Sequence, residues 1–521
     1  MKPGRIFLSG IAAGTVAVTL SFVLRIQAGG VYLPELAASA LFSLVPGYLE
    51  SRAVENLGPL AKDSAYLGAS VLNAVFLGLI PVVLHRFGRL PKEGFRKFAV
   101  LAALPFVLML SLWALFSSLA QVSSQPTGLG FLALSLLAPS LVFGLIMGFV
   151  RLTARPPSPV VYPQEQFRGK FSRKRRLFFK SAITATVGAA LLYYGVGFLL
   201  SKSGPVVTTK DEAAAIIASQ VTPNDEFYRV DVNVIAPSVD SSTWSLNLHG
   251  LVSNPMTIGY PQLLALASIE EYATLECVSN NVGGDLMSTA KWKGVRLKDL
   301  LTTARVATGA DYVVFRCSDR YDVGIPLDRA MMEGTILAYE MNGAKLPVEH
   351  GFPVRAIVPG LYGMMNAKWI TSIEVVQGVY DGFWQRKGWT DIATYQAGST
   401  ILTPGNSQLR DRFPLPSSLA GVSGNQVAVV GAAFAGDRGI QKVEVSMDRG
   451  QSWELASLYE PLSQYTWVFW KLDWNPPGSG SYELMVRATD GNGQTQVATM
   501  TDPFPNGATG YDVVDIRVSN S

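Results

Sequence analysis

The sequence of 521 residues contains very little cysteine and histidine. It has 2 cysteines, Cys277 and Cys317, and 3 histidines. Two cysteines this far apart form no Cys-x-x-Cys pair, so the chain has neither a disulfide framework nor a c-type haem attachment site. A b-type haem inside a membrane needs a histidine pair within the apolar spans, and only His85 lies near one, at its edge. The sequence therefore predicts that this chain carries no haem of its own.

Acidic residues are scarce in the first 200 residues. This part has 19 Lys and Arg against 6 Asp and Glu, whereas residues 201–521 have 24 against 33. A basic, apolar first part and an acidic second part indicate a membrane anchor that carries a folded domain. The basic residues lie between apolar runs and have no globular surface of their own, so we predict no nucleic-acid binding.

Long apolar runs are confined to the same first part, and about 20 apolar residues are enough to cross a hydrocarbon core. The run at 33–49 is shorter and is interrupted by Pro46 and Gly47. It is either an interfacial or re-entrant helix, which we favour, or a full span. The predicted spans are residues 4–28, 66–84, 98–119, 129–150 and 181–200.

Lys and Arg gather in two stretches, the loop 85–97 and the link 151–180, which carries nine of them against Glu165 alone. Loops rich in Lys and Arg stay in the cytoplasm. Five spans then place the chain after Leu200 on the outer face of the cell membrane. For residues 1–150 two roles remain open, a plain anchor and an anchor that also faces a quinone or a partner.

The most informative stretch for chemistry is the turn that Cys277 enters at the end of an apolar run. Residues 275–284 read Leu-Glu-Cys-Val-Ser-Asn-Asn-Val-Gly-Gly. A thiolate in such a turn suits a soft metal ion, and the small residues let a bulky cofactor approach the backbone closely. The alternative for a lone cysteine is a small buried hydrophobe.

This turn and the segment after it resemble the sulfite oxidase family of molybdopterin enzymes. The family signature is a Cys-x-x-Asn turn, a glycine pair and a Trp-x-Gly-x-x-Leu-x-x-Leu-Leu segment, which here runs from Cys277 to Leu301. A second block follows in the right order, at 350–355 and 359–369. The resemblance implies a multi-domain fold: an N-terminal α-helical transmembrane region, a central α+β molybdopterin domain and a C-terminal all-β immunoglobulin-like sandwich.

The resemblance also implies a set of site residues. Cys277 would be the ligand to molybdenum and the catalytic residue. Arg and Lys are in addition the donors that a cofactor phosphate needs, since Arg binds it bidentately. For Cys317 the alternative is a free buried thiol. The residues implied to bind the molybdopterin cofactor are Tyr228, Arg229, Cys277, Cys317, His350, Arg355, Asn366, Ala367 and Lys368.

The chain departs from the sulfite-oxidising members at three places. They have a histidine where Asp231 falls, an arginine soon after the ligand cysteine where residues 281–284 lie, and a tyrosine where Trp389 aligns. Fewer cationic donors for an oxyanion are therefore visible. Sulfite-type oxidation and sulfoxide-type reduction both remain open.

Short alternating strands with Gly, Asn and Asp turns follow residue 426 and favour a β-sandwich, which in this family is often a dimerisation domain. The stretch 172–180, with Arg175 and Arg176, resembles a twin-arginine export signal, which would move a domain already folded around its cofactor. Basic residues that only fix the orientation are the alternative. We expect a transmembrane region at 1–150, a basic cytoplasmic linker at 151–180, a last transmembrane helix at 181–200, a catalytic domain at 205–400 and the sandwich at 410–521.

The function expected from these features is oxygen-atom transfer on a small substrate by a membrane-anchored molybdopterin oxidoreductase, outside the cytoplasm. Because the chain has no haem site, electrons would pass to or from a separate carrier, a quinone or a cytochrome. A homodimer would form through the C-terminal domain. The alternative is a non-enzymatic, membrane-anchored β-rich binding or adhesion protein with a degenerate pterin fold.

Overall fold

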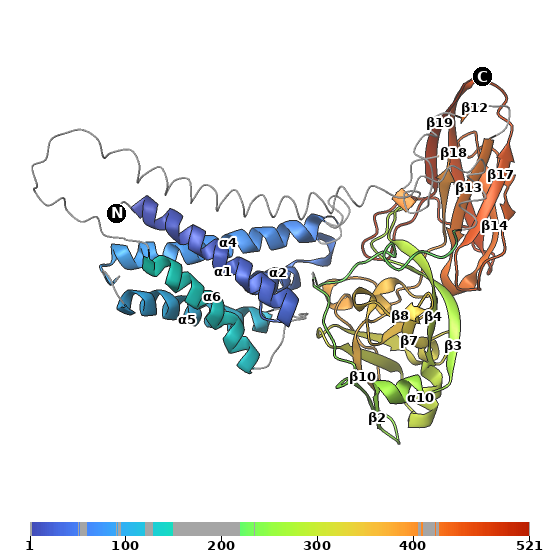
Figure 1. Ribbon diagram of the computed structural model, residues 1–521. Coiled ribbons are helices and arrows are strands. Elements are labelled where there is room, and N and C mark those ends of the chain that lie inside the picture. Colours follow the sequence, from blue (N-terminus) through green and yellow to red (C-terminus); the bar gives the residue numbers. More distant parts are fainter. Residues whose placement is uncertain are drawn as a thin grey trace, which may run out of the picture. The chain divides into compact units, whose positions relative to one another are not determined.

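The computed structural model describes residues 3–49, 52, 60–89, 91, 95–119, 129–149, 219–233, 235–404, 408–409, 422–423 and 427–519. The chain forms two compact units (Figure 1), residues 1–44 with 60–204 and residues 45–59 with 205–521. The predicted linker 151–180, with its twin-arginine-like motif, and the predicted last span 181–200 lie outside the described residues.

The described part of the first unit is helical. Four helices hold apolar stretches long enough to cross a membrane, with 25 residues in α1, 23 in α4, 25 in α5 and 18 in α6. This confirms the apolar helices expected in this region. The helix α2 has 12 residues, about 18 Å at 1.5 Å per residue, against about 30 Å of hydrocarbon core. The bounds are α1 (Pro3–Ala28), α2 (Leu33–Leu44), α4 (Leu60–Arg86), α5 (Phe95–Leu119) and α6 (Leu129–Phe149).

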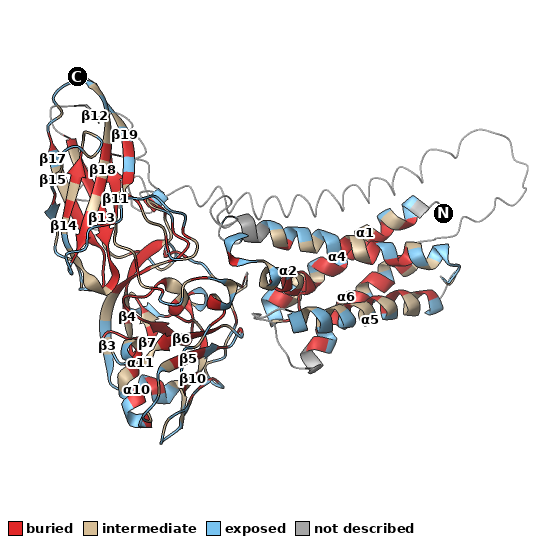
Figure 2. Ribbon diagram, turned by 180° about the vertical axis from the view of Figure 1, so that it is seen from behind, coloured by how far each residue is buried: buried red, intermediate tan, exposed pale blue. Residues whose placement is uncertain are grey.

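Small residues let these helices approach closely. A Cβ added to Gly10 of α1 would lie 2.7 Å from the backbone oxygen of Gly78 in α4, and one added to Gly144 of α6 would lie 2.8 Å from the Cβ of Ala102 in α5. Close approach through small residues is typical of helices that associate in lipid. Exposed residues lie along these helices (Figure 2), and large apolar side chains are among them, with Leu72 at 69 %. Such side chains fit a lipid surrounding.

A buried ion pair joins α1 to α2. The Nε of Arg25 lies 2.8 Å from Oε2 of Glu35, and each side chain is 3 % exposed. A charge in so apolar a setting is stable only with a partner, so the pair fixes the start of α2 against the end of α1.

Residues 219–395 of the second unit form an α+β part with two sheets. The first sheet has the order β2-β1-β10-β5-β6, in which only β1 and β10 run parallel. The second has the order β3-β4-β7-β8, with β9 paired to β7. The strands are β1 (Ser245–Gly250), β2 (Met256–Gly259), β3 (Ser268–Glu276), β4 (Met287–Arg296), β5 (Tyr312–Cys317), β6 (Asp322–Pro326), β7 (Ile336–Met341), β8 (Ala344–Lys345), β9 (Arg355–Ile357) and β10 (Ile370–Val376). The short helices are α9 (Tyr260–Leu264), α10 (Leu297–Ala304) and α11 (Leu327–Ala330).

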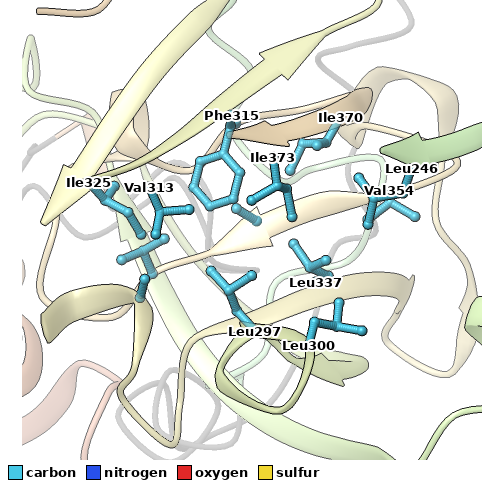
Figure 3. Packing of buried hydrophobic residues seen from close by; sticks show 14 of the residues in the cluster. Leu246, Leu297, Leu300, Val313, Phe315, Ile325, Leu337, Val354, Ile370 and Ile373 are labelled. Carbon is cyan, nitrogen blue, oxygen red and sulfur yellow. The ribbon is translucent and has the colours of Figure 1, made fainter. Parts of the chain in front are cut away.

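An apolar cluster packs α10 against the first sheet. Leu297 of α10 lies in one cluster with Val313 and Phe315 of β5 and Ile373 of β10 (Figure 3), and all four are fully buried. Burial of such a side chain contributes roughly 1.5–3 kcal/mol. The cluster therefore fixes β5, and with it the residues that follow the strand.

Two further sheets make up the β-rich C-terminal part, with the orders β11-β13-β17-β16 and β12-β19-β18-β14-β15. Val429 and Trp470 of the first share a core with Val445 and Leu484 of the second, and Figure 2 shows buried residues along β13, β14, β17 and β18. The strands are β11 (Gly398–Thr403), β12 (Val422–Ser423), β13 (Val427–Phe434), β14 (Ile440–Ser446), β15 (Glu454–Leu455), β16 (Ser457–Leu458), β17 (Val468–Trp474), β18 (Gly480–Asp490) and β19 (Asp512–Ser519).

Hydrogen bonds attach β3 to this C-terminal part. The amide of Thr274 donates to the carbonyl of Tyr465 at 3.0 Å, and the amide of Trp467 donates to Oγ1 of Thr274 at 2.9 Å. Since β3 ends at Glu276, directly before Cys277, both parts of the second unit fix the position of this cysteine.

Candidate functional site

A cavity of about 130 Å³ lies beside the end of β3. Its lining contains every predicted site residue except Cys317. The lining comes mainly from three stretches far apart in the sequence, 227–232, 275–279 and 350–369, and the cavity is completed by Asp319, Tyr321, Trp384 and Trp389.

Cys277 is held in a tight turn. Its amide donates to the carbonyl of Leu286 at 2.9 Å, and its own carbonyl accepts the amide of Asn280 at 3.0 Å. The side chain of Asn280 closes the turn, because Nδ2 donates to Oε1 of Glu276 at 3.0 Å and Oδ1 accepts the amide of Leu286 at 3.0 Å. A Cβ at Gly284 would collide with that same Oδ1. The asparagine and the glycine of the motif thus build the turn that presents the thiol.

The thiol of Cys277 is itself buried, with the residue 8 % exposed, and its Sγ lies 3.0 Å from Oγ of Ser279. Burial raises its pKa, and the hydrogen bond from Ser279 opposes this rise. A cation at the sulfur reverses the balance, since a coordinating thiol is deprotonated outright. The position suits a metal ligand and leaves little access for an external electrophile.

Arg355 of β9 provides a buried cation on the cavity wall. It is 5 % exposed, and its guanidinium lies 4.9 Å from the ring centroid of Trp292. Nη1 and Nη2 donate to the carbonyls of His350 and Asn366 at 3.1 and 3.4 Å. Its Nε is buried without a hydrogen-bond partner. Burial lowers the pKa of Arg355 to about 10, so the side chain is still charged at neutral pH.

His350 and Tyr228 lie around an aromatic residue, Phe227. The ring of Phe227 stacks on Tyr228 at 5.5 Å and meets His350 edge-on at 5.4 Å. Nε2 of His350 lies 2.9 Å from the carbonyl of Asn224, which makes Nε2 the protonated nitrogen. Burial, followed by the charge of Arg355, lowers the pKa of His350 to about 4, so this side chain is neutral at pH 7.

Lys368 and Arg229 share one carboxylate. Lys368 Nζ lies 3.0 Å from Oδ2 of Asp231, and Arg229 Nε lies 2.9 Å from the same oxygen. Lys368 also donates to the carbonyl of Glu349 at 3.2 Å. Burial lowers the pKa of Lys368 to about 8, while the charge of Asp231 opposes this shift. The ammonium is thus held charged by its ion pair.

The predicted residues Asn366 and Ala367 line the cavity from a loop that is held by hydrogen bonds. The Asn366 side chain is committed to the backbone: Oδ1 accepts the amide of Val358 at 2.7 Å, and Nδ2 donates to the carbonyls of Leu361 and Tyr362 at 3.1 Å each. The Ala367 carbonyl accepts the amide of Ala356 at 2.8 Å. Both residues shape the wall, and the asparagine amide is already occupied.

Cys317 does not line the cavity. It is the last residue of β5 and lies 6 % exposed in the apolar cluster with Val313 and Phe315. Burial raises the pKa of its thiol well above the usual range. The structure thus places the side chain on the core face of the strand, as the alternative of a free buried thiol describes.

Two residues that follow Cys317 reach the cavity instead and were not predicted as site residues. Asp319 is 2 % exposed, and its oxygens accept the amide of Tyr321 at 3.0 Å and Nδ2 of Asn233 at 2.6 Å. The hydroxyl of Tyr321 donates to the carbonyl of Met364 at 2.7 Å. The sequence signal for these two site residues is a carboxyl and a tyrosine in the loop directly after a buried strand, because binding residues are often found on loops.

Asp319 should make stability depend on pH. Burial raises its pKa from 3.8 to about 6, so the folded state binds the proton more tightly, and stability from this group is present below pH 3.8 and lost as the pH rises through 6. A shift of this size corresponds to roughly 3 kcal/mol. We expect the free-energy gap between wild type and Asp319→Asn, from unfolding curves, to change by about this amount between pH 3 and 7.

His350 acts with the opposite sign in the same range. Its lowered pKa means that stability is lost as the pH falls from 6.5 towards 4. The difference between wild type and Asp319→Asn removes this contribution, since both proteins keep His350. A gap that is independent of pH between 3 and 7 contradicts the assignment.

The comparisons with known proteins agree with this geometry. Residues 233–384 match the oxidoreductase molybdopterin binding domain, and residues 392–503 match the Mo-co oxidoreductase dimerisation domain. The chain is 32 % identical over 292 residues to the sulfite oxidase of Arabidopsis thaliana, which covers 48 % of this chain and 74 % of that protein. The chain belongs to the sulfite oxidase family.

Two other relatives show how far the similarity extends. The uncharacterized oxidoreductase YuiH of Bacillus subtilis is 34 % identical over 150 residues, covering 29 % of this chain and 74 % of that protein. The mitochondrial sulfite oxidase of Rattus norvegicus is 30 % identical over 318 residues, covering 54 % of this chain and 58 % of that protein. The chain therefore spans less than two thirds of the length of the rat relative.

Membership in the sulfite oxidase family makes the chain a molybdenum-dependent oxidoreductase with a molybdopterin cofactor. This assignment contradicts the alternative of a non-enzymatic binding or adhesion protein. The residues present fit that cofactor. Cys277 offers a thiol to the metal, and the buried Nε of Arg355 has no hydrogen-bond acceptor, so it can bind a phosphate oxygen. A Cβ at Gly363 would run into the hydroxyl of Tyr228 and lie 3.2 Å from the carbonyl of Glu276. Glycine at 363 thus leaves room for the Tyr228 hydroxyl in the cavity wall.

Proposed function

We propose that this protein is a membrane-anchored oxidoreductase that transfers an oxygen atom to or from a small substrate on the outer face of the cell membrane. The observation that carries the proposal is the shared cavity: the Cys277 thiol lines it together with Arg355, Lys368 and His350. A soft metal ligand and phosphate donors in one cavity are what a molybdenum centre with a phosphorylated pterin requires.

Each side chain has a separate task in this proposal. Molybdopterin, when bound, supplies the two-electron oxygen-atom transfer. Cys277 binds the metal, and Arg355 binds the cofactor phosphate through its unbonded Nε. Lys368 offers a further donor to the phosphate. Neutral His350 positions its own backbone carbonyl, which accepts a hydrogen bond from Nη1 of Arg355. Trp384 and Trp389 on the cavity wall exclude water from the reacting atoms.

The electrons pass, in this proposal, to or from a separate carrier, a quinone or a cytochrome. The sequence offers no haem site, and the apolar helices would hold the enzyme at a membrane, where such carriers are found. Residues 1–150 would contribute four spans and one interfacial or re-entrant helix, with residues 151–180 on the cytoplasmic side. The twin-arginine-like motif and the helix 181–200 would deliver and anchor a catalytic domain at 205–400 that folds around its cofactor first.

The C-terminal region, residues 410–521, is proposed to be an immunoglobulin-like sandwich that joins two copies of the chain. Two sheets with a common core support the sandwich. The match to a dimerisation domain supports the homodimer.

The proposal is tested on the full chain, purified in detergent from cells that make molybdopterin. We expect about one molybdenum per chain and turnover in a dye-linked assay, with ferricyanide as the acceptor for sulfite or reduced viologen as the donor for sulfoxides. The preparation should show no haem absorbance. Protein without molybdenum, from cells that load another molybdopterin enzyme normally, would contradict the proposal.

A further inference from the structure

The strand that leads to Cys277 lies at the end of its sheet. In the order β3-β4-β7-β8, the strand β3 pairs with β4 and leaves its other side open to a further partner. An edge strand presents a row of backbone N–H and C=O groups on that side, and proteins commonly cover it. Tyr272, Thr274 and Glu276 are alternate residues of β3, so their backbone groups share one side of the strand.

A segment of the C-terminal part covers this open side. Oγ of Ser463 donates to the carbonyl of Tyr272 at 2.6 Å, and the amide of Thr274 donates to the carbonyl of Tyr465 at 3.0 Å. The segment 463–467 leads directly into β17, which belongs to the core of the C-terminal part. The contact therefore resembles the addition of a strand to a sheet edge.

The hydroxyl of Thr274 adds a third bond at the same place. Oγ1 accepts the amide of Trp467 at 2.9 Å and lies 2.5 Å from Oγ1 of Thr289, the residue opposite it on β4. Thr274 is 3 % exposed. One buried oxygen thus joins β3, β4 and the segment 463–467, and its loss removes the acceptor of a buried amide.

These bonds end directly before the metal ligand. The amide of Glu276 donates to the Tyr395 hydroxyl at 3.4 Å on the same side of β3, and Cys277 is the next residue. The end of a strand opens more easily than its middle, and contacts along its edge oppose this opening. A site residue must be held within roughly 0.5 Å of its productive position. The position of the Cys277 sulfur therefore depends on the covered edge.

We infer that Thr274 is a positioning residue for the metal ligand, and that the segment 463–467 gives the C-terminal part a task at the metal site besides the proposed dimerisation. This inference rests on the proposed function. The family match of residues 392–503 describes dimerisation, which concerns two chains, whereas these contacts lie within one chain. Thr274 does not line the described cavity, so it acts on the metal through the strand that leads to Cys277.

The test uses the full, molybdenum-loaded chain and compares wild type with Thr274→Val, which keeps the shape and removes the hydroxyl. We expect kcat in the dye-linked assay to fall about tenfold with KM within about twofold of wild type, because a displaced ligand affects the reaction more than substrate binding. The electron paramagnetic resonance spectrum of the partly reduced protein should show shifted g-values, since these report the ligand geometry of molybdenum. Thr274→Ser restores the hydroxyl and should restore both.

Ser446→Ala is the matched control in the C-terminal part. Ser446 of β14 is fully buried, and its Oγ donates to Oδ1 of Asp448 at 2.7 Å and accepts the amide of Gly450 at 2.8 Å. Loss of this hydroxyl should lower the unfolding temperature, as in Thr274→Val, and leave kcat and the spectrum like those of wild type.

Ser463→Ala provides a second variant if Thr274→Val does not fold. It removes the bond to the carbonyl of Tyr272 at a partly exposed position. Because Tyr272 lies farther from Cys277 than Thr274 does, Ser463→Ala should shift the spectrum in the same direction by a smaller amount.

The outcomes separate this inference from the proposed function. Wild-type kcat and spectrum in Thr274→Val, a loss that Thr274→Ser does not restore, or an equal spectral shift in Ser446→Ala shows that Thr274 does not position the ligand, while oxygen-atom transfer stands. A loaded wild type that turns over neither sulfite nor a sulfoxide contradicts the proposed function. In that case a spectral shift in Thr274→Val that Thr274→Ser reverses still supports the positioning role.

Discussion

Replacing Cys277 by serine is expected to lower turnover by about a thousandfold or more, while the protein stays folded. A hydroxyl is a harder and much less acidic donor than a thiol, so it replaces a thiolate poorly at a soft metal. The sulfur already lies 3.0 Å from the Ser279 hydroxyl, so the position accepts an oxygen without a clash. The measurement is the dye-linked rate per molybdenum atom, together with the unfolding temperature.

Cys317 provides the matched control. It is the other cysteine of the chain, and its side chain lies in the apolar cluster off the cavity. Cys317→Ala should cost on the order of 1 kcal/mol of stability through lost packing and leave the rate per molybdenum within about twofold of wild type. Equal losses of activity in Cys277→Ser and Cys317→Ala contradict the assignment of the metal ligand.

Replacing Arg355 by lysine should remove most of the bound cofactor. The change keeps the charge and discards the planar fork, of which two nitrogens bond the carbonyls of His350 and Asn366 while Nε lacks a partner. A lysine has a single nitrogen and serves either the loop or the phosphate. We expect the pterin and molybdenum content of the purified protein to fall about tenfold or more.

Arg316→Lys is the matched substitution outside the site. Arg316 pairs with Glu374 on β10, and its side chain is 46 % exposed, so a lysine there keeps a surface ion pair of low value. Its cofactor content should equal that of wild type. Full cofactor content in Arg355→Lys would rule out the proposed phosphate contact.

The sequence predicted the parts of the site that local motifs encode. The turn at Cys277 and the second block, 350–369, both line the cavity, because glycines and amides at fixed spacing dictate backbone turns. A motif does not specify which atoms of a residue contact the cofactor. Asn366 is a residue type that can contact a cofactor, yet its side-chain amide already makes hydrogen bonds to two carbonyls and one amide of its own loop.

Pairings across the chain could not be predicted in this way. The sequence marks Asp231 as a departure from the family, but its bond to Lys368 joins residues 137 positions apart, and only the packed fold brings them together. Cys317 is different, since the necessary signal was present. Phe315 and Cys317 are two positions apart on one strand and must share a face. Phe315 is a large apolar residue that favours the core, so the same reasoning places Cys317 in the core as well.

X-ray absorption at the molybdenum edge distinguishes a metal bound by Cys277 and a pterin dithiolene from one held by the dithiolene alone. The full chain should show a third sulfur neighbour at thiolate distance, in addition to the two of the dithiolene. Cys277→Ser that retains its metal should show only those two. Two sulfur neighbours in the wild type, or three in the variant, would show that Cys277 does not bind the metal.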